Sequence, residues 1–217
     1  MVNNQLIGLF GGAFDPIHNA HLSIAKNCID KVGLDKIIII PTGKSVIKKN
    51  LASHYHRLEM TKLVFNTKYF EVSDFEIREY INKKKVSFTI DTLKHFAKNN
   101  SNTYFFILGS DSLSSVESWK KWKDLTKYVH LIIIERQIKN LMKKGINSSV
   151  NTFINDNLTE NINDLKKHRN GLIYRLPMPL LHNSSSDIQN KVKNNINTSK
   201  LLPKKIQDYI IKNKLYS

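Results

Sequence analysis

The segment GGAFDPIHNAH at residues 11–21 constrains the fold and chemistry of this chain more than any other. It follows a short apolar run, Leu6–Phe10, of the kind found in buried strands, and it precedes Leu22–Ile29, where apolar residues recur at helical spacing. The glycine pair is therefore predicted at a strand-to-helix turn. Glycine there permits positive φ and a close approach of a phosphate to main-chain N–H groups, while Asp15-Pro16 is typical of a tight turn.

Two histidines close this segment. His18 and His21 stand three residues apart, which places them on one face of the first turn of the predicted helix. The N-terminus of a helix attracts anions through its free N–H groups and its dipole. We therefore predict a phosphate site in which both histidines are catalytic. The simpler interpretation is a glycine turn before an amphipathic helix that carries two exposed histidines.

The rest of the chain predicts an α/β fold with a doubly wound parallel sheet. Continuous apolar runs such as Ile37–Ile40 and Leu131–Ile134 suit strands that helices cover on both faces. The predicted strands, with helical segments between them, are residues 6–10, 36–40, 69–72, 103–108, 129–134 and 172–176. We expect a single domain over residues 1–217. Ligands of such folds bind beyond the carboxyl ends of the strands, near the point where the strand order reverses.

Composition limits the classes of function. The formal charge is +16, from 34 basic and 18 acidic residues, but the lysines are dispersed in pairs and triplets rather than gathered in one patch. This distribution favours steering of polyanionic small substrates over nucleic-acid binding. No run approaches 18 apolar residues, so we expect no membrane span, no signal peptide and a cytoplasmic location. The single cysteine, Cys28, cannot form an internal disulfide.

The last part of the chain contains one polar stretch and two predicted helices. Residues 145–170 are rich in asparagine and weak in periodicity, which indicates a variable excursion and not a domain. After it, Ser184-Ser185-Ser186-Asp187 is typical of a capped helix start, and Pro203 is placed to open a last helix that runs to Lys212.

Residues 11–21 resemble the HxGH signature of the nucleotidyltransferase superfamily, in the branch that includes the nicotinate-nucleotide adenylyltransferases. Ala20 departs from the usual glycine of that signature. The resemblance implies a Rossmann-like fold and the joining of nicotinate mononucleotide to ATP, with release of pyrophosphate, in NAD biosynthesis. It implies Mg²⁺ as the companion of ATP and no metal site of the protein's own. It leaves the oligomeric state open.

The resemblance also implies residues that hold ATP. Gly11, Gly12 and Phe14 lie in the first loop, and aligning the next loop on Pro41 puts Lys48 at a catalytic lysine that contacts triphosphate. Further ATP contacts are implied at the ends of later strands and at a serine-rich helix start: Gly109, Asp111, Arg136, Ser184, Ser185 and Ser186. Gln189 replaces an arginine expected at the β- and γ-phosphates, so Lys191 or Lys193 compensates or turnover is slow.

For the mononucleotide, the resemblance implies contacts from Ala13, Thr89 and Trp119. Thr89 lies in a predicted helix start whose hydroxyls suit a carboxylate, although Ser87 could simply cap that helix. Trp119 offers a ring that can stack on a pyridine, whereas Trp122 suits core packing.

Two points stay open at this level. Arg57 matches a family arginine, but its role could equally be helix packing or an ion pair with Glu59 or another neighbour. Other superfamily members, a pantetheine-phosphate adenylyltransferase or a cytidylyltransferase, fit less well with the chain length, the Phe-Asp-Pro turn and Trp119. A nucleotide- or RNA-binding protein that kept the fold and lost turnover is the alternative from another class; Gln189 and the net charge favour it.

Overall fold

The computed structural model describes residues 4–45, 51–98, 101–136, 147–179 and 184–217. The chain forms two compact units, each assembled from three stretches of sequence. The first unit comprises Met1–Phe10, Cys28–Ile37 and Phe88–Leu180, and the second comprises Gly11–Asn27, Ile38–Ser87 and Leu181–Ser217. The expectation of one domain over residues 1–217 stays a prediction.

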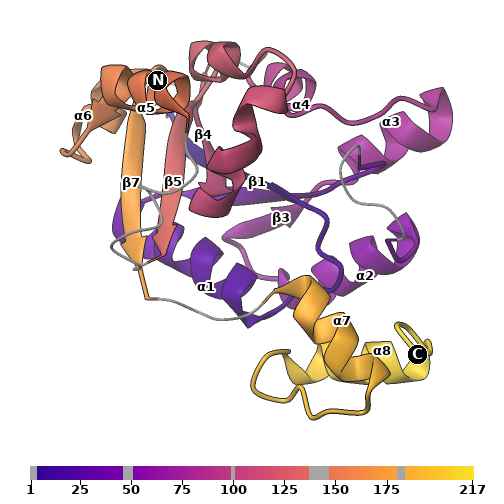
Figure 1. Ribbon diagram of the computed structural model, residues 1–217. Coiled ribbons are helices and arrows are strands. Elements are labelled where there is room, and N and C mark those ends of the chain that lie inside the picture. The colour runs from indigo at the N-terminus through magenta and orange to yellow at the C-terminus, as the bar shows by residue number, and fades with distance from the viewer. Residues whose placement is uncertain (1–3, 46–50, 99–100, 137–146, 180–183) are drawn as a thin grey trace. The chain divides into compact units, whose positions relative to one another are not determined.

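Among the described residues, seven strands form one sheet in the order β3-β2-β1-β4-β5-β7-β6. Figure 1 shows β5 and β7 of the first unit side by side. The strands are β1 (Leu6–Gly12), β2 (Lys36–Pro41), β3 (Phe70–Val72), β4 (Thr103–Gly109), β5 (His130–Arg136), β6 (Leu158–Thr159) and β7 (Ile173–Met178). The pairs β1–β4, β4–β5, β5–β7 and β6–β7 are parallel. The strand order reverses at β1, which confirms the doubly wound α/β fold. Only β6, which is two residues long, has no counterpart among the predicted strands.

The apolar runs that predicted these strands are buried on both faces, as a helix-covered parallel sheet requires. In the first unit, Phe105 and Ile107 of β4 and Ile132 and Ile133 of β5 are each at most 1% exposed. Register places Phe106 opposite Leu131 and carries the pairing on to the ends of both strands. The core of this unit therefore lies in and against its central strands.

The helices occupy the segments between the strands. The α-helices are α1 (Asn19–Asn27), α2 (His54–Val64), α3 (Phe75–Lys83), α4 (Thr89–Phe96), α5 (Ser148–Asn157), α6 (Asp164–Lys167), α7 (Ser185–Lys193) and α8 (Lys204–Lys212). A π-helix, η1 (Cys28–Val32), extends α1, and two 3₁₀ segments, η2 (Ser110–Ser118) and η3 (Trp122–Lys127), follow β4. Among the described residues, no helix has the length and apolar character needed to cross a membrane.

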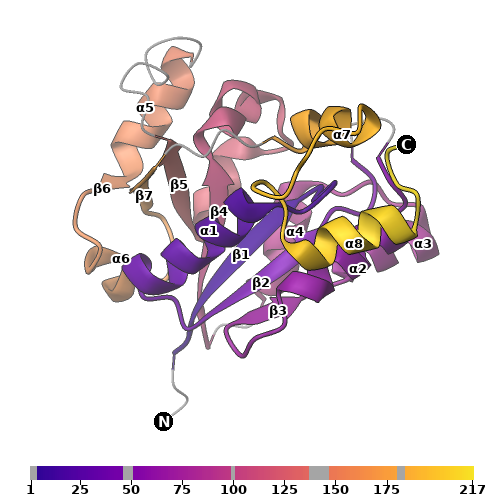
Figure 2. The ribbon, with the colours of Figure 1, turned by 90° about the horizontal axis from the view of Figure 1, so that it is seen from below.

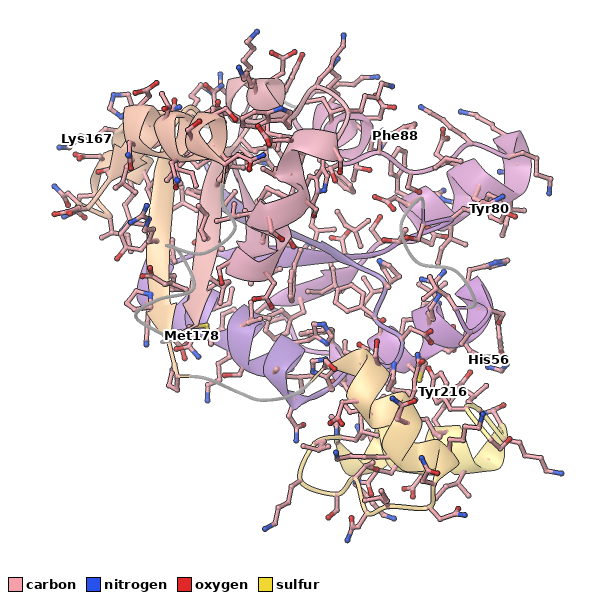
Figure 3. All side chains as sticks on the ribbon, viewed as in Figure 1. His56, Tyr80, Phe88, Lys167, Met178 and Tyr216 are labelled. Carbon is pink, nitrogen blue, oxygen red and sulfur yellow. The ribbon has the colours of Figure 1, made fainter. Side chains whose placement is uncertain are left out.

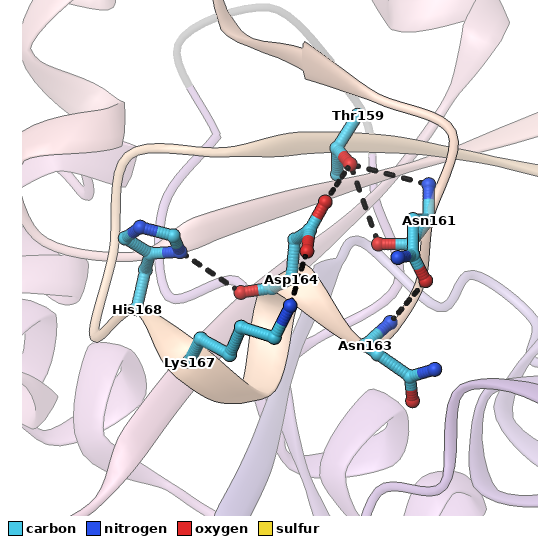
Figure 4. Close-up of polar contacts among 6 residues, drawn as sticks. All are labelled: Thr159, Asn161, Asn163, Asp164, Lys167 and His168. Carbon is cyan, nitrogen blue, oxygen red and sulfur yellow. Dashed lines mark hydrogen bonds and ion pairs between the residues drawn. The ribbon is translucent and has the colours of Figure 1, made fainter.

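The described part of the excursion predicted over residues 145–170 holds α5, β6 and α6, which weak periodicity did not predict. Val150 and Ile154 of α5 are each 1% exposed, so a short amphipathic helix lies within the polar composition. Figure 4 shows how the next turn is fixed: the Thr159 hydroxyl donates to the Asp164 carboxylate (3.1 Å), which also accepts from Lys167 (3.1 Å).

His130, the buried first residue of β5, forms hydrogen bonds with the backbone at the end of that segment. His130 Nδ1 accepts from the N–H of Leu172 (3.1 Å), so its Nε2–H donates to the carbonyl of His168 (2.9 Å). Burial lowers the pKa of His130 below its ordinary value, and the two backbone contacts oppose this only in part. His130 is therefore a neutral, structural histidine.

In the second unit, α8 runs alongside α2 (Figure 2). Met60 of α2 and Ile206 of α8 are fully buried, and His56 Nδ1 lies 3.0 Å from the Tyr209 hydroxyl. The prediction for the last helix is confirmed, although Pro203 occupies the cap position and not the first turn.

Candidate active site

The loop after β1 has its unusual backbone at Phe14, not at the glycines. β1 continues through Gly11 and Gly12, and the positive φ of this loop belongs to Phe14 (49°). The expectation that the glycines supply positive φ is therefore wrong. Gly12 is needed for space instead, because a Cβ there would lie 3.1 Å from the Phe14 ring. That ring is 2% exposed and fills the volume beneath the strand end.

His18 and His21 lie together, as their spacing predicts. Their rings stack with centroids 3.8 Å apart and planes 28° apart, and the edge of the Phe14 ring packs on His21 at 5.1 Å. His18 immediately precedes α1 and is 3% exposed, whereas His21 is half-buried. The N–H of His18 donates to His21 Nδ1 (3.3 Å), so a neutral His21 carries its proton on Nε2. This tautomer gives the site a fixed hydrogen-bond donor.

The amide groups at the start of α1 are less available than the helix-terminus argument predicts. The N–H of Asn19 donates to the Leu201 carbonyl (3.0 Å), and the N–H groups of His21 and Leu22 both point to the His18 carbonyl (2.9 and 3.4 Å). These three donors have acceptors inside the chain. The prediction that free amide groups at this helix start bind a phosphate therefore loses these three donors, whereas the predicted role of the imidazoles is not affected.

A buried carboxylate lies three residues before His18. Asp15 is 1% exposed. Its Oδ1 accepts from the Tyr216 hydroxyl (2.6 Å), and its Oδ2 accepts from the N–H of Ala52 (3.1 Å) and from Gln189 Nε2 (3.0 Å). Gln189 Nε2 also lies 2.6 Å from the Asp15 carbonyl. We call these four residues the Asp15 clamp. Sequence reasoning singled out Asp15 as part of a turn and Gln189 as a departure from the family pattern, but it did not predict the contact between them.

Arg57 supports the same loop from α2. The side chain is 2% exposed and donates to the carbonyls of Ala52 (3.0 Å), Ala13 (2.9 Å) and Gly43 (3.2 Å). Burial lowers the pKa of Arg57, and the nearby Asp15 carboxylate counteracts that effect. Glu59 pairs with Lys62 instead (3.1 Å). Of the two roles left open for Arg57, packing with backbone hydrogen bonds is therefore the correct one.

The serine-rich start of α7 is fastened to the same loop. Ser184 Oγ accepts from the N–H of Asp187 (3.1 Å) and caps the helix, as predicted, and the Ser185 hydroxyl donates to the Pro16 carbonyl (3.2 Å). Ser186 is exposed. Lys191, one of two lysines considered as substitutes for the missing arginine, pairs with Asp187 at 2.8 Å. The ATP contacts assigned to these serines stay predictions.

In the first unit, Thr89 is the first residue of α4, and an ion pair connects this helix start with the Trp119 segment. Lys120 Nζ lies 3.0 Å from the Asp91 carboxylate and 4.9 Å from the centroid of the Phe88 ring. The two residues expected to hold the mononucleotide in this unit thus stand on segments that Lys120 joins. Phe88 occupies the cap position of α4, so the interpretation of Ser87 as the cap is wrong.

Trp119 is half-buried at the end of η2, with its ring 6.4 Å from that of Phe106. Its indole Nε1 is buried and has no hydrogen-bond partner among the residues that the structure describes. Trp122 is half-buried, and its ring lies against that of Phe153 of α5 with centroids 5.1 Å apart, so it packs at the edge of the core. A Cβ on Gly109 would meet no atom within 4 Å in the described part of the chain, and Asp111 is exposed just beyond it.

Two predicted site residues cannot be placed. Lys48 lies outside the described residues, and the side chain of Arg136, the last residue of β5, is also not described. Within the described ranges, no group of three or more His, Cys, Asp or Glu side chains could hold a metal ion. The buried Asp15 carboxylate already accepts three hydrogen bonds from protein groups.

Comparison with known proteins agrees with this architecture. The family described as cytidylyltransferase-like matches residues 9–201. A probable nicotinate-nucleotide adenylyltransferase of Vesicomyosocius okutanii is 38% identical over 95% of this chain and 94% of its own length. One from Clostridium novyi is 32% identical over 96% and 98%.

A solved structure shares the fold across its whole length. It is the nicotinic acid mononucleotide adenylyltransferase of Plasmodium falciparum complexed with NaAD, which covers 98% of both chains with a TM-score of 0.75 at 23% identity. Identity at that level speaks for the fold alone. The curated relatives and the family match together show that the chain belongs to the nicotinate-nucleotide adenylyltransferases of the cytidylyltransferase-like family.

Proposed function

We propose that this protein transfers the adenylyl group of ATP to nicotinate mononucleotide, a step of NAD biosynthesis. A 5′-phosphate oxygen of the mononucleotide attacks the α-phosphorus of ATP, the bond from that phosphorus to the bridging oxygen of pyrophosphate breaks, and nicotinate adenine dinucleotide forms. The nucleophile is already an anion, so no covalent enzyme intermediate and no strong base are needed. Catalysis is then chiefly positioning and charge stabilisation.

The observation that supports this most directly is the stacked pair of His18 and His21 at the end of β1. His21 carries a donor on Nε2 because its Nδ1 accepts from the His18 N–H. Two adjacent imidazoles can donate to the oxygens of the α-phosphate and of the departing pyrophosphate, where charge develops. Both are assigned as catalytic, and Lys48 is assigned as an ammonium that contacts the triphosphate and the leaving pyrophosphate.

The other assignments follow the two substrates. ATP is assigned to Gly11, Gly12 and Phe14 in the first loop, and also to Gly109, Asp111, Arg136, Ser184, Ser185 and Ser186. Nicotinate mononucleotide is assigned to Ala13, Thr89 and Trp119. The Lys120–Asp91 ion pair supports the second assignment, because it connects the segments of Thr89 and Trp119 within one unit.

Mg²⁺ enters as part of the substrate. This ion prefers several waters and substrate phosphate oxygens over an all-protein cage. We therefore assign the ion to the triphosphate and not to Asp15, because the Asp15 carboxylate already accepts three hydrogen bonds from protein groups. The ion would neutralise triphosphate charge while the histidines hold the transferring phosphoryl group.

The test is an assay of pyrophosphate release in the presence of Mg²⁺. ATP is combined in turn with nicotinate mononucleotide, nicotinamide mononucleotide or phosphopantetheine, and a further mixture contains CTP and a phosphorylated alcohol. Chromatography identifies the product of each mixture. We expect nicotinate adenine dinucleotide, and we expect His18→Ala and His21→Ala each to lower kcat by at least about 100-fold. His56→Ala, a change at a histidine of α2 that bonds Tyr209, is the control and should retain activity. Equal activity of all four proteins, or turnover only with another acceptor, would contradict the proposal.

A further inference from the structure

We infer that Tyr216 and Gln189 are positioning residues for the proposed adenylyl transfer, acting through the Asp15 carboxylate on the loop that carries His18 and His21. The inference concerns the site of the proposed function, and its kinetic test rests on that function. Its structural test does not.

The clamp joins segments that are remote in sequence to the loop that precedes the histidines. The partners of Asp15 lie 37 residues away at Ala52, 174 residues away at Gln189 and 201 residues away at Tyr216. Ile17, which connects Asp15 with His18, is fully buried. A shift of the Asp15 side chain would therefore move His18 together with its backbone N–H, the group that orients the His21 ring.

The chemistry of the contacts makes the clamp stiff. A buried carboxylate is costly unless donors satisfy its lone pairs, and hydrogen bonds to an ionised acceptor are shorter and stronger than neutral ones. The Tyr216 hydroxyl, at 2.6 Å, fits that description. Burial and the bond to Asp15 both raise the pKa of Tyr216, so its hydroxyl keeps its proton and remains a donor at all pH values of interest. Tyr216, labelled in Figure 3, follows α8 in the second unit.

Gln189 gives the clamp its second fixed point. One Nε2 group contacts both the carbonyl and the Oδ2 of Asp15, at 2.6 and 3.0 Å, so the amide bridges the backbone and the side chain of the same residue. The Ser185 hydroxyl, one turn earlier on α7, holds the next carbonyl, that of Pro16. Residues of α7 thus form hydrogen bonds with two successive residues of the turn, Asp15 and Pro16, and the role of Gln189 is to hold Asp15 in place.

The decisive variant is Tyr216→Phe, which removes one hydroxyl and keeps the ring. The matched control is Tyr209→Phe, because Tyr209 also lies in the last part of the second unit but bonds His56 and not Asp15. We expect Tyr216→Phe to lower kcat about tenfold, with the KM values for ATP and the mononucleotide changed less than about twofold, because the histidines are displaced while substrate contacts remain. Tyr209→Phe should leave both constants unchanged.

Hydrogen exchange supplies a readout that does not need activity. In peptides that cover residues 13–22 and 51–57, amide exchange should be faster in Tyr216→Phe than in the wild type, and unchanged in Tyr209→Phe. If Tyr216→Phe does not fold, Gln189→Met replaces it with the same expectations. Faster exchange with no measurable turnover of any of the proteins would uphold the clamp and contradict the proposed function. Unchanged exchange, or a loss of kcat equal in both tyrosine variants, would overturn the clamp.

Discussion

Replacing Arg57 by methionine tests whether the loop around the histidines depends on a buried guanidinium. Methionine keeps much of the apolar volume but leaves three carbonyl oxygens, those of Ala13, Gly43 and Ala52, without their donor. An unsatisfied buried acceptor costs about 1–3 kcal/mol, and we take the lower value because Ala13 and Ala52 are only half-buried. The sum is about 3 kcal/mol of unfolding free energy.

A loss of about 3 kcal/mol corresponds to a fall in Tm of about 6–12 °C for a chain of this length. Urea unfolding and differential scanning calorimetry of Arg57→Met measure both quantities. Arg57→Lys keeps the charge but cannot reach all three carbonyls, so its unfolding free energy should lie between that of Arg57→Met and that of the wild type. Arg78→Met is the matched control, because Arg78 is exposed and pairs with Asp74, the residue at the N-cap position of α3.

The reasoning would be refuted by an Arg57→Met protein whose stability lies within about 1 kcal/mol of the wild type, since this would mean that water or a repacked loop satisfies the carbonyls. A destabilisation of Arg78→Met as large as that of Arg57→Met would also refute it, because the effect would then belong to charge and not to the buried contacts.

Three further predictions follow from other parts of the structure. Acidification from about pH 7 to pH 5 should lower the free energy of unfolding, because burial lowers the pKa of His130 and the unfolded chain therefore binds a proton there more readily than the folded chain. Urea unfolding at several pH values in this range should show that the free energy of unfolding depends less on pH in His130→Gln than in the wild type. An equal dependence on pH in both proteins would count against this explanation. Trp119→Ala should raise the KM for the mononucleotide at least about tenfold more than that for ATP in steady-state assays, and equal effects would place the ring elsewhere. Gly43→Ala should destabilise the fold by about 1–3 kcal/mol in urea unfolding, because its Cβ would lie 2.1 Å from the Glu76 carbonyl. Gly109→Ala, whose Cβ meets no described atom within 4 Å, is its control, and similar losses in both variants would show that the clash is not the cause.

The sequence alone determined the layered fold, because its signals are local. Short runs of β-branched and other apolar residues such as Ile37–Ile40 and Leu131–Ile134 favour strands covered on both faces, and the structure places them in β2 and β5. The spacing of His18 and His21 likewise predicted that their rings would lie together, and they do, although His18 directly precedes α1 and is not part of the helix. Sequence periodicity did not predict α5 and α6, because only a few apolar residues in this polar stretch, such as Val150 and Ile154, lie on its buried side.

Only the tertiary structure decided what holds the histidine loop in place. Nothing local in the sequence shows that the carboxylate of Asp15 meets a glutamine 174 residues away and a tyrosine 201 residues away, or that Arg57 binds carbonyls and not Glu59. These partners come together because buried polar groups must find donors and acceptors wherever packing brings the chain. Periodicity and short motifs report which residues face the core, whereas the identity of a buried group's partner depends on how distant segments pack.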